Sequence, residues 1–331
     1  MSDTPTHAGT HLVLLCPGQG AQAVGMARSW FDASPKARAI LEEADRIFGA
    51  GPDGRALTDI AFHGPQETLN RTDLSQPALF AAAVASYHAL ADDFGGATVR
   101  AVAGLSLGEY TALHLAGAFG FEDGLRLVMT RGRLMQDAAE ASKGGMVALI
   151  GADEAQALEV CARATAAGGV LVPANFNATG QIVLSGSIDA CDRALEAAGE
   201  VGVRATKLQV AGAFHSPLMQ PAADAMGEVL AKTPIAPLSC EAWSNVTAAP
   251  HAANNPDLLR QRLVEQLVSP VRWSQSCLAL LSAMSADGTR ATAAFHELAP
   301  GSVLKGLMRR IDKTCEVIPH DSAPDAAPVA A

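Results

Sequence analysis

Short apolar runs that end at glycine-rich turns, each followed by an amphipathic helical stretch, limit the fold of this chain more than any other feature. Residues 11–18 (HLVLLCPG) and 99–106 (VRAVAGLS) have the pattern of buried strands. Helical patterns follow over residues 34–49, 76–95 and 108–119. Strands that alternate with helices in this way predict an α/β fold, in which helices cover both faces of a parallel sheet.

The pattern changes over residues 144–210 and predicts a small inserted subdomain. The order there is strand, helix, two strands, helix and strand, which is the βαββαβ arrangement of a ferredoxin-like unit. We therefore expect a discontinuous large subdomain of residues 11–143 and 211–318. Residues 1–10 are polar and residues 319–331 are rich in Ala, Pro and Asp, so we expect flexible ends.

The composition indicates a substantial hydrophobic core. The 331 residues are 49% hydrophobic and 18% charged, which excludes a largely disordered protein.

The formal net charge of −10 repels polyanions, so no nucleic-acid partner is expected. The sequence has no apolar run of the ~18 residues that a membrane span needs. Its start, MSDTPTHAGT, lacks the basic and apolar regions of a signal peptide, and we expect no membrane association.

The cysteines indicate neither a disulfide framework nor a metal site. They are widely separated, form no Cys-x-x-Cys motif and have no histidine at ligand spacing. Free thiols in a reducing cytoplasm are the expected state. The six positions are Cys16, Cys161, Cys191, Cys240, Cys277 and Cys315.

The segment Gly104-Leu105-Ser106-Leu107-Gly108 is the strongest indication of chemistry. It fits Gly-x-Ser-x-Gly and lies between a strand pattern and a helical pattern, which is the setting this motif requires. Its glycines allow a tight turn that exposes the serine hydroxyl, and the N-terminus of the following helix favours developing negative charge. Ser106 is therefore a candidate nucleophile. The alternative is a glycine-rich turn in which Ser106 only caps the helix.

A serine nucleophile needs a base, and His215 differs from the other histidines in its position. It lies in the turn GAFHSP (212–217), directly after the inserted subdomain, where a side chain can overhang the main sheet. No acidic residue is evident as the partner that would orient it. Its spacing alone favours a loop histidine whose ring is satisfied by backbone groups.

Two further segments are weaker candidates for the same site. The loop PGQGAQ (17–22) follows the first strand, and in a parallel sheet it ends at the same edge as the Ser106 turn. Its N–H groups can therefore face an oxyanion, although an ordinary strand-to-helix turn is the simpler interpretation. It is not a P-loop, because the Lys-Ser/Thr ending is absent. Arg131 lies in an apolar helical stretch, where an arginine is usually solvated or ion-paired at the surface.

Taken together, these segments resemble one family, the malonyl-CoA:acyl-carrier-protein transacylases, which includes the stand-alone, trans-acting acyltransferases of polyketide synthases. The matches follow the family's order from the first strand to the last helix and cover nearly the whole chain. They are PGQGAQAVGM (17–26), GLSLGEYTAL (104–113), TRGRLMQ (130–136), PANFNATGQIVLSG (173–186), AFHSPLM (213–219), QLVSPVRW (266–273) and ELAPGSVLKGLMRRI (297–311).

The resemblance implies an α/β-hydrolase-like large subdomain that carries a ferredoxin-like small one. It also implies catalytic roles. Ser106 would be the acylated nucleophile, and His215 its general base and acid. The backbone N–H groups of Gln19 and Leu107 would form the oxyanion hole. The backbone carbonyl of Gln266 would orient His215, which would explain why no acidic partner is visible.

The same resemblance implies the residues that select the substrate. Arg131 would pair with the free carboxylate of a malonyl group, and an acetyl group would leave this cation unpaired. Phe214 resembles the residue of malonyl-selective members, where its bulk crowds a 2-methyl branch. One methylene changes the binding free energy by only ~1–3 kcal/mol, so we expect incomplete discrimination against methylmalonyl groups.

Leu105 departs from the family, which usually has His before the nucleophile. We therefore expect an altered pocket shape and altered access of water to the acyl-serine. Together Leu105 and Phe214 favour polyketide over fatty-acid synthesis.

The implied reaction is a two-step transfer. Ser106 attacks the thioester of malonyl-CoA, and the phosphopantetheine thiol of an acyl carrier protein then attacks the acyl-serine. No permanently bound cofactor or metal is expected, and the enzyme is expected to be a monomer.

One alternative is an editing acyl hydrolase of the same fold, which would have no use for a buried Arg131. The other is a catalytically silent docking protein of a synthase, and the presence of Ser106, His215 and Arg131 argues against it.

A basic cluster near the C-terminus is a candidate docking site for the carrier protein. Carrier proteins are typically acidic, so a partner of net charge −10 needs a local basic patch to bind one. At helical spacing Lys305, Arg309 and Lys313 lie on one face. The alternative is a solvated helix face that complements its own dipole. Arg204 and Lys207 of the small subdomain are the next candidates.

Overall fold

A five-stranded parallel sheet forms the centre of the large subdomain. The computed structural model describes residues 11–51 and 53–324. The strand order is β7-β2-β1-β8-β9, and every pair of neighbours runs parallel. The strands are β1 (His11–Cys16), β2 (Thr98–Gly104), β7 (Glu241–Trp243), β8 (Ala293–Glu297) and β9 (Val317–Pro319).

β1 lies in the middle of the sheet and is buried on both faces. Leu12, Leu14 and Cys16 join one hydrophobic cluster, and Val13 and Leu15 join another on the opposite face. An uninterrupted apolar run is the pattern expected of a central parallel strand. The cluster that contains Leu12 is called the upper core and the one that contains Val13 the lower core.

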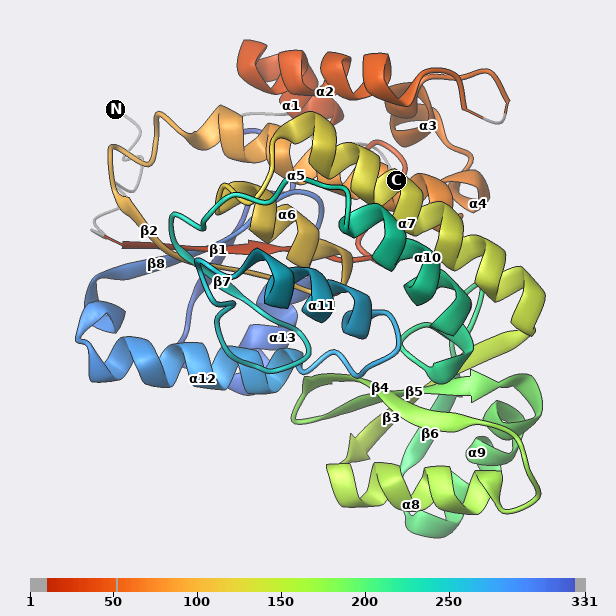
Figure 1. Ribbon diagram of the computed structural model, residues 1–331. Coiled ribbons are helices and arrows are strands. Elements are labelled where there is room, and N and C mark those ends of the chain that lie inside the picture. Colours follow the sequence, from red (N-terminus) through yellow and green to blue (C-terminus); the bar gives the residue numbers. More distant parts are fainter. Residues whose placement is uncertain (1–10, 52, 325–331) are drawn as a thin grey trace.

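Helices cover both faces of the sheet (Figure 1). Those whose buried side chains join the upper core are α1 (Arg28–Ala33), α2 (Pro35–Phe48), α3 (Leu57–His63), α4 (Gln66–Leu69), α5 (Thr72–Leu90), α6 (Leu107–Leu115), α7 (Phe121–Ser142), α10 (Gln220–Leu230), which follows the 3₁₀ turn η1 (Pro217–Met219), and α11 (Pro256–Gln266). Those that join the lower core are α12 (Trp273–Ala286), which precedes the 3₁₀ turn η2 (Thr289–Thr292), and α13 (Val303–Ile311).

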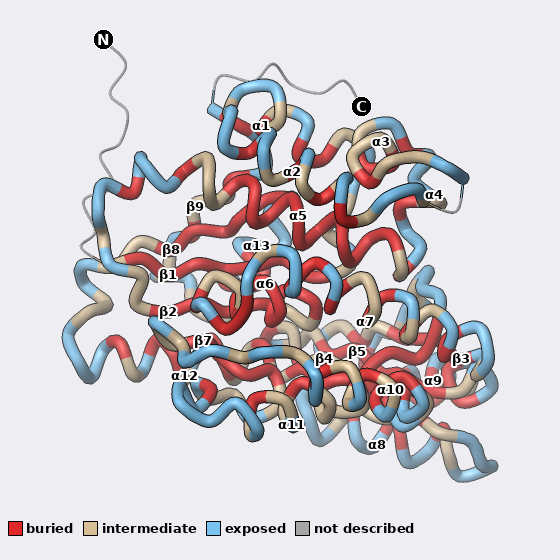
Figure 2. The backbone as a smooth tube through the Cα atoms, turned by 45° about the horizontal axis from the view of Figure 1, so that its top comes forward, coloured by how far each residue is buried: buried red, intermediate tan, exposed pale blue. Residues whose placement is uncertain are grey.

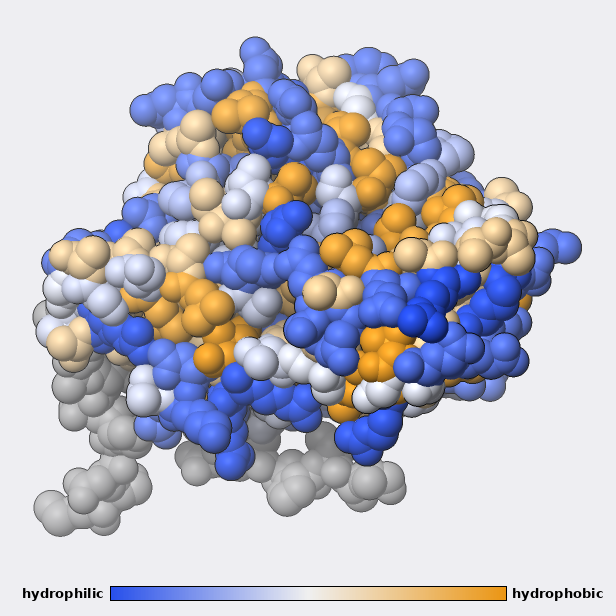
Figure 3. All heavy atoms as spheres, turned by 90° about the horizontal axis from the view of Figure 1, so that it is seen from below, coloured by the Kyte–Doolittle hydropathy of each residue, from blue (hydrophilic) through white to orange (hydrophobic). Residues whose placement is uncertain are grey.

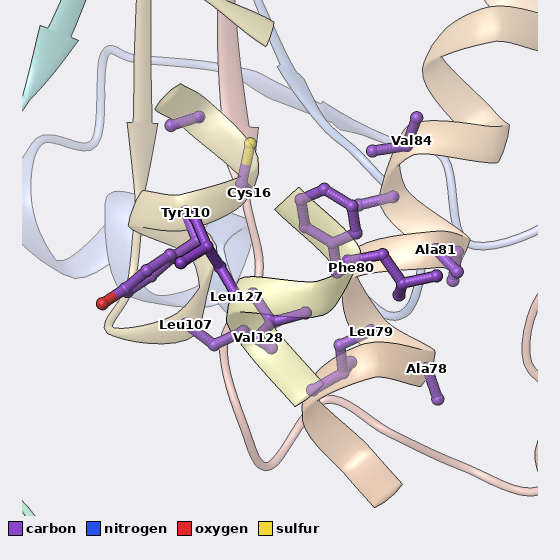
Figure 4. Close-up of a cluster of buried hydrophobic side chains, with 14 of the residues drawn as sticks. Cys16, Ala78, Leu79, Phe80, Ala81, Val84, Leu107, Tyr110, Leu127 and Val128 are labelled. Atoms are coloured by element: carbon purple, nitrogen blue, oxygen red, sulfur yellow. The ribbon is translucent and has the colours of Figure 1, made fainter. Parts of the chain in front are cut away.

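α5 is buried over almost its whole length, as Figure 2 shows. A helix that is apolar on all sides belongs in the core of a large domain. Figure 4 shows Leu79 and Phe80 of α5 gathered with Leu107 of α6 and Val128 of α7. The sequence predicted a start at residue 76, but the helix begins four residues earlier, at Thr72. Pro77 therefore lies in its second turn, where it removes one backbone hydrogen bond and does not end the helix.

The small subdomain is an antiparallel four-stranded sheet with two helices. Its elements are β3 (Gly144–Ala152), α8 (Glu154–Thr165), β4 (Leu171–Ala178), β5 (Gly180–Ser187), α9 (Ile188–Val201) and β6 (Arg204–Lys207). The strand order is β4-β5-β3-β6, and a third hydrophobic cluster lies between this sheet and its helices. The predicted βαββαβ unit and the predicted α/β class are confirmed.

The two subdomains are joined by backbone hydrogen bonds as well as by packing. The N–H of Phe176 in β4 donates to the carbonyl of Val271 at 2.9 Å, and the N–H of Val271 donates to the carbonyl of Ala174 at 2.8 Å. Met146 and Val183 of the small sheet join the upper core of the large subdomain. The small sheet is thus held against the large subdomain on the face opposite its own helices.

The expectation of a flexible C-terminal end is wrong for residues 319–324. Pro319 belongs to β9, the N–H of His320 donates to the carbonyl of Glu297 at 2.9 Å, and Ala323 is buried. These contacts exist because the tail packs beside β8 and α1. The predicted flexible segment 1–10 and the remainder of the C-terminal one, 325–331, lie outside the described residues.

The surface seen from below is mostly hydrophilic, and its hydrophobic groups gather in a few smaller areas (Figure 3). Among the described residues, no helix combines the length and the apolar character needed to cross a membrane.

Candidate active site

The turn between β2 and α6 holds Ser106 in a strained conformation. Ser106 has φ 53° and ψ −102°, backbone angles that residues other than glycine rarely adopt. A Cβ on Gly104 would lie 1.9 Å from the backbone of Gly108, and one on Gly108 would lie 2.1 Å from the carbonyl oxygen of Cys16. Both motif glycines are therefore required by close backbone packing, and the turn presents Ser106 at the N-terminus of α6.

The glycine-rich loop after β1 packs directly against this turn. The N–H of Leu105 donates to the carbonyl of Cys16 at 3.1 Å, and a Cβ on Gly18 would lie 2.2 Å from the carbonyl oxygen of Leu105. Adjacent parallel strands end at the same edge, so Gln19 and Ser106 line one cavity. Leu107 supplies the first N–H of α6 beside them.

His215 lies within hydrogen-bond distance of Ser106. Its Nε2 is 2.8 Å from Ser106 Oγ, and its Nδ1 is 2.8 Å from the carbonyl oxygen of Gln266. A carbonyl only accepts, so Nδ1 carries the proton and Nε2 is free to accept one from the serine hydroxyl. The backbone carbonyl that the resemblance implied as the orienting partner of His215 is thus in contact with it.

Burial, followed by the positive charge of Arg131, lowers the pKa of His215 from 6.5 to about 4. The carbonyl of Gln266 opposes this shift by accepting from the ring. The imidazole is therefore neutral at pH 7, which is the state that a general base requires.

Arg131 lies inside the protein and not at the surface, where helical arginines usually lie. It projects from α7 with 1% of its surface exposed. Nη1 donates to Gln76 Oε1 at 2.8 Å, while Nη2 donates to Gln266 Oε1 at 2.9 Å and to Ser106 Oγ at 3.1 Å. Burial lowers the pKa of Arg131, and the nearby Tyr110 and Glu109 oppose that shift. Its hydrogen-bond partners among the described residues are neutral, so the guanidinium can still take a carboxylate.

Ser106 and His215 line a cavity of about 580 Å³ between the two subdomains, and Arg131 contacts Ser106 from within the protein. Leu105 and Phe214, the predicted selectivity residues, line it together with Ser106 and His215. The other lining residues are Gln19, Gly20, Gln22, Glu67, Asn70, Arg71, Met135, Gln136, Met146, Asn175, Asn177, Val183, Leu208, Gln209, Val210 and Ala211.

Known proteins with the same architecture match the chain over nearly its full length. Residues 13–326 match the family model described as an acyl transferase domain. A malonyl CoA-acyl carrier protein transacylase of Escherichia coli K12 is 39% identical over 306 residues, which are 92% of this chain and 94% of that protein. The chain belongs to the malonyl-CoA:acyl-carrier-protein transacylase family.

Solved structures of transacylases have the same fold. The enzyme from Xanthomonas oryzae superposes with a TM-score of 0.85 at 41% identity, covering 95% of each chain. A malonyl-transacylase in complex with a type II polyketide-synthase acyl-carrier protein (PlMCAT:AntF) superposes with a TM-score of 0.85 at 33% identity, covering 95% of this chain and 96% of that one.

Sequence reasoning missed several polar residues that surround the transacylase site. Gln76 holds Arg131, as described above. Asn245 holds the Ser106 turn from both sides: its Oδ1 accepts from the N–H of Ser106 at 2.7 Å, and its Nδ2 donates to the carbonyl of Gly104 at 2.7 Å. Asn245 follows the short strand β7, so a correct assignment of that strand would have placed it at the same sheet edge.

The predicted basic stripe is shorter than the sequence suggested. Lys305 and Arg309 are exposed on α13, but this helix ends at Ile311. Lys313 is exposed beyond the end and does not continue the helical face, because Asp312 is extended and its carboxylate accepts from the N–H and hydroxyl of Thr314.

α13, with the residues that precede it, touches both subdomains. Gly301, just before the helix, packs against Ala21 of the first loop. Near its other end, Arg310 donates to Gln181 of the small subdomain at 3.0 Å.

Proposed function

We propose that this transacylase moves a malonyl group from malonyl-CoA to the phosphopantetheine thiol of an acyl carrier protein through an acyl-serine. One observation carries the proposal: the hydroxyl of Ser106 lies 2.8 Å from the neutral Nε2 of His215 and 3.1 Å from the buried guanidinium of Arg131. The first contact activates a nucleophile. The second puts a carboxylate-binding group within one acyl group's length of it.

In the first half-reaction, Nε2 of His215 takes the Ser106 proton as Oγ attacks the thioester carbon. The developing oxyanion accepts from the N–H groups of Gln19 and Leu107, and loss of one such donor costs about 2.7–4 kcal/mol in comparable sites. The C–S bond breaks, His215 returns the proton to the departing thiolate, and malonyl-Ser106 remains. In the second half-reaction the carrier-protein thiol gives its proton to His215 and attacks the ester carbon. The bond from this carbon to Ser106 Oγ breaks, and His215 returns the proton to Oγ.

Arg131 selects the acyl group by charge. The free carboxylate of malonyl would replace Ser106 Oγ as a partner of Nη2, and the fork of the guanidinium suits a carboxylate. An acetyl group would leave the buried cation without this partner. The same argument disfavours an editing hydrolase for uncharged acyl chains.

The test is the intact mass of the Ser106→Ala variant after incubation with malonyl-CoA. We expect the wild type and a Ser282→Ala control, altered at an exposed serine of α12, to gain one malonyl group. The Ser106→Ala variant should gain none. A malonyl adduct that persists on this variant would refute the nucleophile assignment. Addition of holo carrier protein should discharge the wild-type adduct faster than water does, which an editing hydrolase would not show.

We also propose that the enzyme serves polyketide synthesis in the cytoplasm as a trans-acting acyltransferase. Leu105 and Phe214 support the pathway, since both line the cavity beside Ser106, and the six free thiols are consistent with a reducing compartment. The measurement is the rate of malonyl transfer to a polyketide-synthase carrier protein and to a fatty-acid carrier protein. A higher kcat/KM with the fatty-acid carrier protein would contradict this assignment.

A further inference from the structure

A buried pair of ionisable residues lies directly behind the catalytic groups, and the transfer mechanism does not use it. Glu109 of α6, three residues after Ser106, and His251 of the loop before α11 both have side chains that are 1% exposed. His251 Nε2 is 2.7 Å from Glu109 Oε1. Buried acids are rare unless they are fully hydrogen-bonded, so the contacts of Glu109 indicate what it holds in place.

The second oxygen of Glu109 accepts from two groups of the active site. Gln266 Nε2 donates to Glu109 Oε2 at 2.6 Å, and the N–H of Asn245 donates to the same oxygen at 3.2 Å. Gln266 also supplies the carbonyl that accepts from His215, and Asn245 holds the Ser106 turn. One carboxylate therefore contacts the two residues that set the positions of the nucleophile and the base.

The orientation of the Gln266 side-chain amide follows from Glu109. An amide can turn by 180° and exchange its oxygen with its nitrogen. Here Nε2 donates to Glu109 and to the carbonyl of Ser106 at 3.0 Å, which leaves Oε1 to accept from Arg131 at 2.9 Å. A carboxylate only accepts, so it forces the nitrogen toward itself. The opposite orientation would point an NH₂ group at the guanidinium.

This arrangement places a negative charge near Arg131 without occupying its carboxylate-binding face. Glu109 helps to keep Arg131 protonated against the effect of burial. A carboxylate in direct contact with Arg131 would compete with the malonyl carboxylate. The Gln266 amide separates the two charges. Its Nε2 donates to Glu109, and its Oε1, polarised by that contact, accepts from Arg131.

We propose that Glu109 is a positioning residue that acts through Gln266 on Arg131 and thereby sets the preference of the enzyme for an acyl group with a free carboxylate. His251 holds Glu109 in the orientation that this requires. The inference rests on the proposed function, because it assumes that Arg131 binds the malonyl carboxylate.

The test is the Glu109→Gln variant, assayed for acylation of Ser106 by malonyl-CoA and by acetyl-CoA. The new amide no longer forces the orientation of Gln266, so Arg131 loses a fixed acceptor. We expect the malonyl-to-acetyl ratio of kcat/KM to fall by about tenfold or more, the size of one hydrogen bond to a charged group. Most of the change should appear as a higher KM for malonyl-CoA. A merely structural defect would lower both rates alike and leave the ratio unchanged.

Glu297→Gln is the matched control, because Glu297 is the other wholly buried glutamate among the described residues and also accepts two N–H groups. It should keep the wild-type ratio. An unchanged ratio in Glu109→Gln, or the same change in both variants, would overturn the proposal. Failure of the proposed function would appear differently, as a wild type that does not acquire malonyl on Ser106.

A second pair of variants covers the case in which Glu109→Gln does not fold. His251→Leu removes the donor to Glu109 Oε1, whereas His251→Gln retains one. We expect the malonyl-to-acetyl ratio to fall in His251→Leu and to stay within about threefold of wild type in His251→Gln. Equal ratios in wild type and His251→Leu would overturn the proposal.

Discussion

Two of the five described non-glycine residues with positive φ angles meet at the site. Ser106 and His215 both have positive φ angles, 53° and 56°, although neither is glycine. Such conformations cost of order 1–3 kcal/mol each and persist only where the surroundings fix them. Asn245 fixes the first through two hydrogen bonds, and the carbonyl of Gln266 fixes the ring of the second. The short distance between Ser106 and His215 therefore depends on residues that do not react.

Replacement of Arg131 by alanine should invert the donor preference. Malonyl-CoA loses its charged partner, and we expect its kcat/KM to fall by about 100-fold or more. Acetyl-CoA has no carboxylate to place and should lose little. Competition of the two donors for Ser106, read by intact mass, measures the ratio. Arg126→Ala on the exposed face of α7 is the control. A variant that still prefers malonyl would show that another cation holds the carboxylate.

The low pKa of His215 predicts the acidic limit of activity. His215 must be neutral to act as a base, so self-acylation should be constant from pH 8 to about 5 and fall as pH drops through about 4. A histidine with an unperturbed pKa would make the activity fall near pH 6.5 instead, and this fall is the acidic limb of the pH profile. Arg131→Ala should move the limb upward, because the charge of Arg131 is the second cause of the shift. Acetyl-CoA should be used as donor, since it has no carboxyl group that titrates. A limb near 6.5 in the wild type would contradict the buried, neutral histidine.

The lowered pKa of His215 also makes the free energy of unfolding depend on pH. Between pH 6.5 and about 4 the unfolded chain binds a proton at His215 and the folded chain does not. This contribution is therefore present above pH 6.5 and is lost as pH falls toward 4.

Residues that belong to a local pattern could be predicted from the sequence, and residues brought in by packing could not. Ser106 was identifiable because a glycine-bounded serine between a strand and a helix has a recognisable spacing. His215 and Arg131 acquired roles only through the family resemblance. Glu109 and His251 are 142 positions apart, and no periodicity connects them. Their pairing depends on how α6 and the loop after β7 pack, which a local pattern does not encode.

At the scale of elements, β1, β2 and the four strands of the small subdomain were predicted, whereas β7, β8 and β9 were not. β1 and β2 have several buried residues in a row, whereas β7 and β9 have three residues each. A strand of three residues shows no alternation that distinguishes it from a loop. These strands form because they pair in parallel with β2 and β8. The end of α13 was also misplaced, since a side-chain turn at Asp312 stops the helix without glycine or proline.

Glu297 gives α13 a cap from a different element. Ser302, the N-cap residue, makes no side-chain cap. Glu297 of β8 accepts from the N–H groups of Leu304 and Lys305 at 2.8 and 2.7 Å instead. Burial raises the pKa of this carboxyl from 4.5 to about 7, and the two N–H donors oppose the shift. The stabilisation from a raised pKa is present below pH 4.5 and is lost as pH rises through about 7.

Glu297→Ala should therefore lower the free energy of unfolding by about 1–2 kcal/mol at pH 6, because two N–H groups of α13 lose their acceptor. This decrease in the free energy of unfolding should be smaller above pH 7, because there the wild type no longer has the stabilisation that comes from the raised pKa of Glu297. Urea unfolding at both pH values is the measurement. Glu154→Ala, at an exposed glutamate in the first turn of α8, should change stability by about 0.5 kcal/mol or less. Equal stability of Glu297→Ala and wild type at pH 6 would exclude the capping role.

At the scale of the whole molecule, the site exists only because two subdomains meet. The large subdomain supplies Gln19 and Ser106, while the small one supplies Asn175 and Asn177 of β4 to the same cavity. Backbone hydrogen bonds at Val271 hold the two parts in register. The cavity that leads to Ser106 is lined by both subdomains, so we expect a carrier protein whose phosphopantetheine arm reaches Ser106 to contact both. α13 also contacts both, through Gly301 before it and Arg310 near its end.

The last prediction concerns how an enzyme of net charge −10 binds an acidic carrier protein. We propose that the exposed cations of α13, Lys305 and Arg309, supply the local attraction. Arg309→Glu should raise the KM for carrier protein by about three- to tenfold at low salt, with self-acylation by malonyl-CoA unchanged. Lys232→Glu, an equal charge reversal at an exposed lysine after α10, is the control. At 0.5 M salt the difference between the two variants should shrink, because screening weakens the attraction in one and the repulsion in the other. Equal KM values for both variants at low salt would move the docking site to Arg204 and Lys207 on the small subdomain.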